Sequence, residues 1–148
     1  IKATEKQHRR TLLEGVPKSL PALVRAQRVG DKVHRVGFDW PDVQGSRDKV
    51  TEEVAELDHA ISTSDKRAIE EEMGDVLFAL VNLSRHLHID AEACLRATTN
   101  KFIRRFEHVE KRTISEHGGF ADAAQGRSEP SLQTLDRYWN EAKSLEKA

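Results

Sequence analysis

The chain has 148 residues, enough for one ordinary domain with a buried core. Charged residues make up 33% of it and aromatic residues only 5%, and Gly and Pro number 8 and 4, which argues against a β-sandwich. A net charge of −1 gives no sign of a nucleic-acid or membrane partner. The single cysteine, Cys94, excludes an intrachain disulfide. With no membrane-spanning apolar run and no signal-peptide pattern, we expect a cytoplasmic protein.

Helical periodicity recurs along most of the chain. Residues 1–16 are charged and weakly patterned, and we expect a linker or the tail of a preceding segment, since the chain begins with Ile1 rather than Met. Helices are expected near 19–36, 46–61, 65–88, 91–112 and 131–147, with N-caps at Ser19, Asp90 and Ser131. Residues 113–130 are expected to form a long mobile loop. The predicted fold class is all-α, an antiparallel helix bundle over residues 17–148.

Two acidic pairs occupy matching positions on the second and third expected helices. Because a helix turns about 100° per residue, Glu53 and Glu56 lie beside one apolar stripe, and Glu72 and Asp75 lie at nearly the same offsets beside the next. The two stripes consist of Val50, Val54, Leu57 and Ile61, and of Ile69, Met73, Val76, Leu80, Leu83 and Leu87. A short polar connection makes the two helices antiparallel, so equal offsets place the four carboxylates on one rim.

Four carboxylates on one rim repel one another unless a cation compensates them. An all-oxygen set favours Mg²⁺, with Mn²⁺ as a possible substitute, over zinc. One Glu-x-x-Glu pair alone would be explained more simply as a solvated helix face, but two pairs at matched offsets reverse that preference. Glu56 and His59 also match the Glu-x-x-His motif of di-iron bundles. Such a site needs the motif on a second helix as well, and Phe78 occupies the position where the second histidine would be required.

A basic edge follows the expected core stripe of the fourth helix, which consists of Leu95, Phe102, Phe106 and Val109. Lys101 and Arg105 are one turn apart there and could neutralise phosphate oxygens, although this edge taken alone is explained more simply as a solvated basic face that pairs with neighbouring acids. On the last helix, whose expected core is Leu132, Leu135, Ala142 and Leu145, Trp139 and Lys143 are again one turn apart. Trp139 could stack on a base or complete the core.

The acidic segments resemble the signature of MazG-type nucleoside triphosphate pyrophosphohydrolases, which belong to the all-α NTP pyrophosphatase superfamily. The resemblance rests on Lys49-Val50-Thr51-Glu52-Glu53-Val54-Ala55-Glu56 and Glu70-Glu71-Glu72-Met73-Gly74-Asp75-Val76-Leu77-Phe78. It extends through residues 17–23, 37–40, 100–106 and 139–143, which point to the C-terminal of two tandem MazG domains.

The resemblance implies metal ligands at Glu53, Glu56, Glu72 and Asp75, and nucleotide contacts from Lys101, Arg105, Trp139 and Lys143. It also implies a homodimer, in which a second copy helps to enclose the substrate. The expected activity is magnesium-dependent hydrolysis of NTP or dNTP to a nucleoside monophosphate and pyrophosphate, by attack of water at the α-phosphorus.

Several points stay open. Glu52 and Glu71 lie further from the stripe than the four ligands, and Glu70 is expected to be solvated. Glu52 is nevertheless a candidate to take the proton from the attacking water. A different hypothesis is a catalytically silent helical domain of a tandem MazG protein, which binds nucleotide or a partner and regulates. Related superfamily enzymes act on dUTP, dCTP or a phosphoribosyl-ATP, and alarmones offer similar chemistry, so the base specificity is not predicted.

Overall fold

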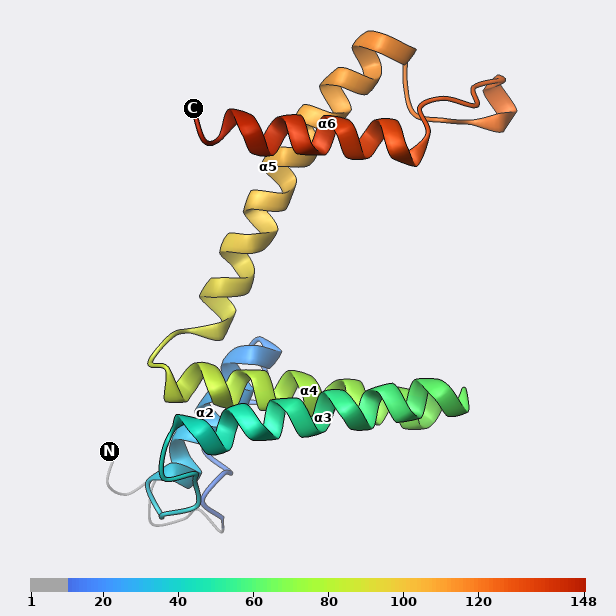
Figure 1. The fold of residues 1–148 in the computed structure, drawn as a ribbon. Coiled ribbons are helices and arrows are strands. Elements are labelled where there is room, and N and C mark those ends of the chain that lie inside the picture. Colours follow the sequence, from blue (N-terminus) through green and yellow to red (C-terminus); the bar gives the residue numbers. More distant parts are fainter. Residues whose placement is uncertain (1–10) are drawn as a thin grey trace. The chain divides into compact units, whose positions relative to one another are not determined.

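The computed structural model describes residues 11–148, and in this range the chain folds into helices joined by turns and one longer connection (Figure 1). The helices are α2 (Ala22–His34), α3 (Val43–Thr63), α4 (Lys66–His86), α5 (Ala91–His117) and α6 (Leu132–Leu145). Between α5 and α6 lie a 3-10 turn, η1 (Ala123–Gln125), and an isolated β-bridge from Asp122 to Arg127. No β-strand forms within residues 11–148, and the predicted all-α class is confirmed.

The chain divides into two compact units, with the boundary inside α5 between Cys94 and Leu95. The first unit holds α2, α3 and α4, and the second holds the remainder of α5 together with η1 and α6. The linker expected at 1–16 lies largely outside the described residues, and from residue 11 onward it forms turns that bury Val16. No helix between residues 11 and 148 is long and apolar enough to cross a membrane.

Side-chain caps fix the ends of several helices close to the predicted positions. Asp65 accepts hydrogen bonds from the amides at the start of α4, and Ser131 does the same for α6, as its predicted N-cap role requires. Asp42 caps α3, which therefore begins at Val43 rather than near Ser46. The prediction of Ser19 as an N-cap is wrong, because α2 begins after Pro21 and has no side-chain cap.

Helices α3 and α4 run antiparallel, side by side, as the short connection predicts (Figure 1). The turn between them consists of Ser64, in the left-handed conformation with φ of 56°, and the N-cap Asp65. The predicted packing faces are only partly right. On α3 the residues buried along the helix are Ser46, Glu53 and Ala60, and on α4 they are Val76, Ala79 and Val81.

Much of the predicted apolar stripe is left exposed in this chain. Val54 and Ile61 are 42% and 52% exposed, and Met73, Leu80 and Leu87 are exposed to a similar degree. The face of α3 that packs on α4 is therefore rotated from the stripe toward Glu53 and Ala60. Small residues such as Ala60 and Ala79 allow two helix backbones to approach closely, which the pattern of large apolar residues does not reveal.

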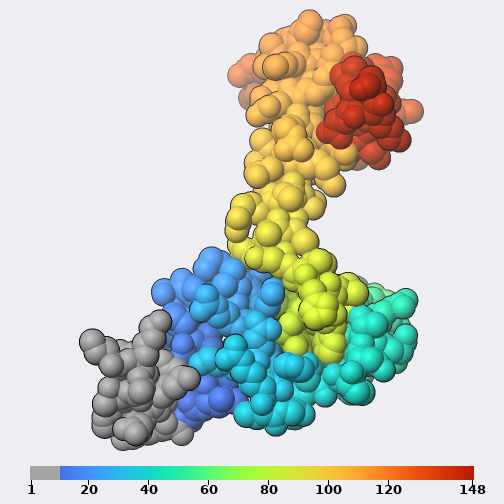
Figure 2. Space-filling view, turned by 90° about the vertical axis from the view of Figure 1, so that its left-hand side faces the viewer, coloured from blue at the N-terminus to red at the C-terminus, as the bar shows by residue number. Residues whose placement is uncertain are grey.

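Helix α2 packs against α4, and Figure 2 shows its blue surface meeting the yellow-green surface of the end of α4. Gly30 is the buried residue of α2, and a Cβ atom at this position would lie 2.8 Å from Nε of Arg85 on α4. The glycine therefore makes room for the arginine side chain. This arrangement positions Arg85 for the contacts described below.

In the second unit α5 continues to His117, one turn beyond the predicted end near Arg112. Thr113 is fully buried in that added turn, and Arg112 pairs with Glu116 at 2.8 Å. Val109 and Ala142 are buried as predicted, and Tyr138 is buried in addition. The other expected core residues on these two helices are not buried, and most of them are more than a third exposed: Leu95, Phe102, Phe106, Leu132, Leu135 and Leu145.

Candidate active site

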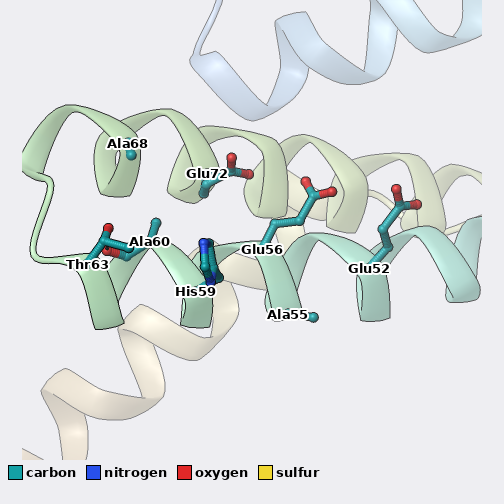
Figure 3. Close-up of a pocket in the computed structure, with 8 residues that line it drawn as sticks. All are labelled: Glu52, Ala55, Glu56, His59, Ala60, Thr63, Ala68 and Glu72. Atoms are coloured by element: carbon teal, nitrogen blue, oxygen red, sulfur yellow. Dashed lines mark hydrogen bonds between the residues drawn. The ribbon is translucent and has the colours of Figure 1, made fainter.

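Three predicted ligands from two helices meet in the first unit. One carboxylate oxygen from each of Glu53, Glu56 and Glu72 lies within 4.8 Å of the other two, so that one cation could bind all three. Glu53 and Glu56 come from α3 and Glu72 comes from α4, and Figure 3 shows Glu56 and Glu72 in the space between the helices. The short α3–α4 connection brings them together, as the matched offsets predict.

These three carboxylates, called the acidic triplet below, are incompletely compensated. Glu53 is 5% exposed, and its Oε1 atom pairs with Nζ of Lys49 at 2.5 Å. Its Oε2 atom and Oε2 of Glu72 are buried without a hydrogen-bond partner. The pKa of Glu56 is raised above its ordinary value, chiefly by the nearby charge of Glu53 and further by burial. Buried carboxylate oxygens without partners are costly, which fits a site that binds a cation.

A cavity of about 500 Å³ lies between α3 and α4 and has two members of the acidic triplet on its wall. Glu56 and Glu72 line it together with Glu52, and Figure 3 shows the side chains of Glu52 and Glu56 extending from α3 on the same side. Glu52 is paired with Lys49 at 3.3 Å and its side chain is 55% exposed. The candidate base therefore lies beside the acidic triplet and within reach of solvent.

Asp75, the fourth predicted ligand, does not join the acidic triplet. Its side chain lines a second cavity, of about 700 Å³, whose wall also includes Glu53 and Lys49. Asp75 is therefore adjacent to a member of the acidic triplet without lying inside the ligand cluster.

The four predicted nucleotide contacts all lie in the second unit. Arg105 donates two hydrogen bonds from Nε and one from Nη2 to the Glu146 carboxylate, at 2.7 to 3.1 Å. Trp139 is half-buried, with its ring centroid 4.8 Å from that of Phe102 and 5.8 Å from the guanidinium carbon of Arg105. Trp139 thus contributes to a local aromatic cluster, which agrees with the alternative in which it completes the core. Lys101 and Lys143 are exposed.

The sequence patterns do not predict a second charged cluster in the first unit. The side chain of Asp39 is 6% exposed and accepts hydrogen bonds from Arg85 at 2.7 Å and from the backbone of Trp40 at 2.8 Å. His86 and His34 each place a ring nitrogen 2.9 Å from its carboxylate. The hydrogen bond from Arg85 is the main reason why the pKa of Asp39 falls well below its usual range. No periodicity links Asp39 to residues on α4, so only the fold brings them together.

The donor set of the acidic triplet suits a hard divalent cation. All three donors are carboxylate oxygens, which Mg²⁺ prefers, and two further oxygens of the same side chains lack partners. Among residues 11–148 it is the one group of this kind that the geometry brings together.

Comparison with known proteins agrees with this geometry. Residues 43–110 match the family model of the MazG nucleotide pyrophosphohydrolase domain, and this range contains α3, α4 and all four predicted ligands. The chain is 40% identical over 144 residues to the nucleoside triphosphate pyrophosphohydrolase/pyrophosphatase MazG of Thermotoga maritima, covering 97% of this chain and 52% of that protein. It is 39% identical over 149 residues to the nucleoside triphosphate pyrophosphohydrolase of Escherichia coli K12, covering 98% of this chain and 52% of that protein.

A further relative is the uncharacterized protein YabN of Bacillus subtilis, which is 40% identical over 147 residues, or 99% of this chain and 29% of that protein. The chain thus spans about half the length of the two pyrophosphohydrolases that it matches. Both the family model and the near-complete alignments include the acidic segments of α3 and α4. Residues 43–110 therefore form a MazG nucleotide pyrophosphohydrolase domain, and nearly the whole chain is similar to the MazG proteins named above.

Proposed function

We propose that the chain hydrolyses nucleoside triphosphates to a nucleoside monophosphate and pyrophosphate, with Mg²⁺ as the cation and Mn²⁺ as a substitute. The observation that carries this proposal is the acidic triplet, in which Glu53, Glu56 and Glu72 converge while two of their buried oxygens lack partners. The names of the Thermotoga maritima and Escherichia coli relatives support the substrate class. The attacking water forms a bond to the α-phosphorus, and the bond from that phosphorus to the bridging oxygen breaks as pyrophosphate leaves.

In this proposal the acidic triplet holds the cation, and Asp75 completes the ligand set when substrate is bound. A bound divalent cation supplies Lewis acidity and offsets the negative charge of the leaving pyrophosphate. Glu52 lies beside the acidic triplet and is half exposed, so it can accept the proton from the attacking water. Lys49 bonds both Glu52 and Glu53 and holds these two side chains in position.

Lys101, Arg105, Trp139 and Lys143 are the proposed nucleotide contacts of the second unit. Arg105 and Lys101 both lie close enough to Glu146 to lower the pKa of its carboxyl group, so this part of the second unit carries positive charge. We propose that this charge binds phosphate oxygens and that Arg105 exchanges its Glu146 partner for substrate.

We also propose that the protein is a homodimer. Four residues of the predicted apolar stripes on α3 and α4, together with Leu77 beside them, are more than 40% exposed, which is unusual for the central hairpin of a helical protein. The four stripe residues are Val54, Ile61, Met73 and Leu80. A second copy that covers this face would bury the stripe that the sequence pattern predicts to be core.

The activity is tested by replacing each proposed ligand separately, as Glu53→Gln, Glu72→Gln and Asp75→Asn. We expect magnesium-dependent pyrophosphate release to fall by about 100-fold or more in each variant, because the cation loses a ligand. Glu70→Gln is the matched control, since Glu70 is an exposed acid on the same helix as Glu72. Chromatography of both products across ribo- and deoxyribonucleoside triphosphates gives rate and specificity together.

Wild-type protein that binds nucleoside triphosphate but releases neither product, over a range of Mg²⁺ and Mn²⁺, would favour the silent regulatory domain instead. Full activity in all three variants would contradict the assignment of the site.

A further inference from the structure

The second cavity, of about 700 Å³, lies beside the acidic triplet in the first unit. Glu53 belongs to both, because it is a member of the triplet and also lines this cavity. The polar part of the wall consists of Asp39, Lys49, Glu53, Asp75, Asn82 and Arg85. Trp40 and apolar residues of α2, of α4 and of the segments before and after α2 complete it. A cavity of this size, mainly apolar with a few fixed polar groups, is typical of small-molecule sites.

The two cations on this wall are already paired, which bears on what the cavity can bind. Arg85 is engaged with the buried carboxylate of Asp39, and Lys49 is engaged with Glu53. Two cations that are neutralised in this way attract a free anion only weakly. The wall therefore favours an uncharged or weakly polar group over a phosphate.

Arg85 also fixes the orientation of Asn82. Nε and Nη2 of Arg85 donate to Oδ1 of Asn82 at 3.2 and 2.6 Å. A guanidinium group has donors only, so the carboxamide oxygen must face Arg85 and the NH₂ group must face away from it. Arg85 is itself held by Asp39, whose carboxylate accepts from Nη2 of Arg85 and also lies 2.9 Å from a ring nitrogen of His86, so the amide keeps one orientation. Asn82 thus offers two hydrogen-bond donors on the cavity wall.

Trp40 supplies an aromatic surface to the same cavity. Its ring lies against Gly45 of α3, where a Cβ atom would approach three ring atoms to 3.0 Å. Its backbone amide donates to Asp39, and the ring packs against α3 while 45% of the residue remains exposed. A held aromatic ring and an oriented amide together suit a flat heteroaromatic group with hydrogen-bond acceptors, such as a nucleobase.

We propose that the second cavity binds the nucleoside part of the substrate, with Asn82 donating to an acceptor atom of the base and Trp40 packing against the base. This inference rests on the proposed function, which identifies the substrate as a nucleoside triphosphate. The phosphates of that substrate would extend toward the acidic triplet. Glu53 and Asp75 mark the end of the cavity where the sugar gives way to the α-phosphate. Asn82 is then a specificity-determining residue, and Asp39 and Arg85 position it.

The variant Asn82→Asp tests this role because it keeps acceptor oxygens for Arg85 and removes the NH₂ donors. The added negative charge acts on every triphosphate, so the comparison uses a nucleoside triphosphate and ribose 5-triphosphate, which has no base. We expect kcat/KM for the nucleoside triphosphate to fall about tenfold further than kcat/KM for ribose 5-triphosphate, as the loss of one hydrogen bond predicts. Gln133→Glu makes the same amide-to-carboxylate change at an exposed position of α6 and should leave the ratio unchanged. Equal losses for both substrates would overturn the proposal.

A binding measurement separates this proposal from the activity itself. The chain has two tryptophans, so the spectrum of Trp139→Phe serves only to assign the indole N–H signal of Trp40 in the nuclear magnetic resonance spectrum of the wild-type protein, which is used for the titration. Adding each of the four common ribonucleosides without phosphate should shift this signal for at least one of them, whereas ribose alone should not. That shift would support the cavity assignment even if no triphosphate were hydrolysed. A Trp40 signal that none of the nucleosides moves would overturn it.

Discussion

Two groups of acidic side chains in the first unit differ in how their charge is compensated. Asp39 is surrounded by donors from Arg85, His86 and the backbone of Trp40, and its pKa lies well below the usual range. In the acidic triplet the charges face one another, and the pKa of Glu56 is raised chiefly by the charge of Glu53. The first arrangement stabilises the fold, whereas the second reduces stability until a cation binds.

Replacing Asp39 by Asn should destabilise the protein by about 3 kcal/mol at pH 7, because Arg85 is left with its charge buried and unpaired. A carboxyl group whose pKa is lower in the folded than in the unfolded state contributes its stability above pH 4 or so, and that contribution is lost as the pH falls. The difference between wild type and Asp39→Asn should therefore shrink as the pH is lowered below about 4. Urea unfolding across this range measures it, with Asp58→Asn at an exposed site of α3 as control.

Replacing Glu56 by Gln should have the opposite effect in the absence of metal. The variant loses one of three mutually repelling charges, so its melting temperature in EDTA should exceed that of the wild type. Added MgCl₂ should then raise the melting temperature of the wild type more than that of the variant, since the cation has lost a ligand. A wild-type melting temperature that does not respond to Mg²⁺ or Mn²⁺ would count against a cation at the acidic triplet.

At the scale of single helices, capping residues were the most informative part of the sequence. The predicted N-caps Asp90 and Ser131 lie at the starts of their helices, and their side chains accept hydrogen bonds from the first free amides. The packing faces were harder to predict. The pattern of large apolar residues identified a stripe on α3, but the helix packs on α4 through Glu53 and Ala60 instead. Periodicity reports which residues avoid water, and it does not say whether a neighbouring helix or a second subunit covers them.

The candidate site likewise has one part that the sequence pattern predicts and one part that it does not. The acidic triplet was predictable because its members belong to two consecutive helices with a short connection, so that local geometry decides their meeting. The contact between Asp39 and Arg85 was not predictable, because it joins the turn after α2 to the end of α4. It depends on the way α2 packs on α4, and in particular on the space at Gly30.

Two glycines on neighbouring helices provide a matched test of this packing. Gly30→Ala places a Cβ atom 2.8 Å from Nε of Arg85, and we expect a loss of about 1–3 kcal/mol from overpacking. Gly74→Ala places its Cβ atom in open space within α4, and we expect a gain of up to about 1 kcal/mol from helix propensity. Chemical denaturation of the two variants beside the wild type measures both effects. Equal and small changes would mean that Arg85 adapts without cost.

At the scale of the whole molecule, the exposed apolar face of α3 and α4 is the main feature that one chain leaves unexplained. Ile61 on α3 and Leu80 on α4 are 52% and 42% exposed, and both belong to the stripe predicted to be core. A soluble monomer rarely exposes so many large apolar side chains on one hairpin. The sequence pattern and the exposed face agree if a second copy of the chain completes the core.

The variant Leu80→Glu should therefore convert a dimer to a monomer, because a charge buried in an apolar interface is unfavourable. Ser62→Glu introduces the same charge at an exposed polar position of α3 and should leave the assembly unchanged. Light scattering after size-exclusion chromatography gives the mass of each variant. A wild-type protein that elutes as a monomer at all concentrations would contradict the proposed homodimer.

The two-residue turn at Ser64 and Asp65 has a consequence for the order of folding. All four predicted ligands fall between positions 53 and 75, so the chain closes only a short loop to bring them together. Contacts this local form early and cost little entropy. A cation that binds the acidic triplet can thus act on the folding transition state as well as on the native state. We expect Mg²⁺ to accelerate refolding of the chain, and not only to slow its unfolding.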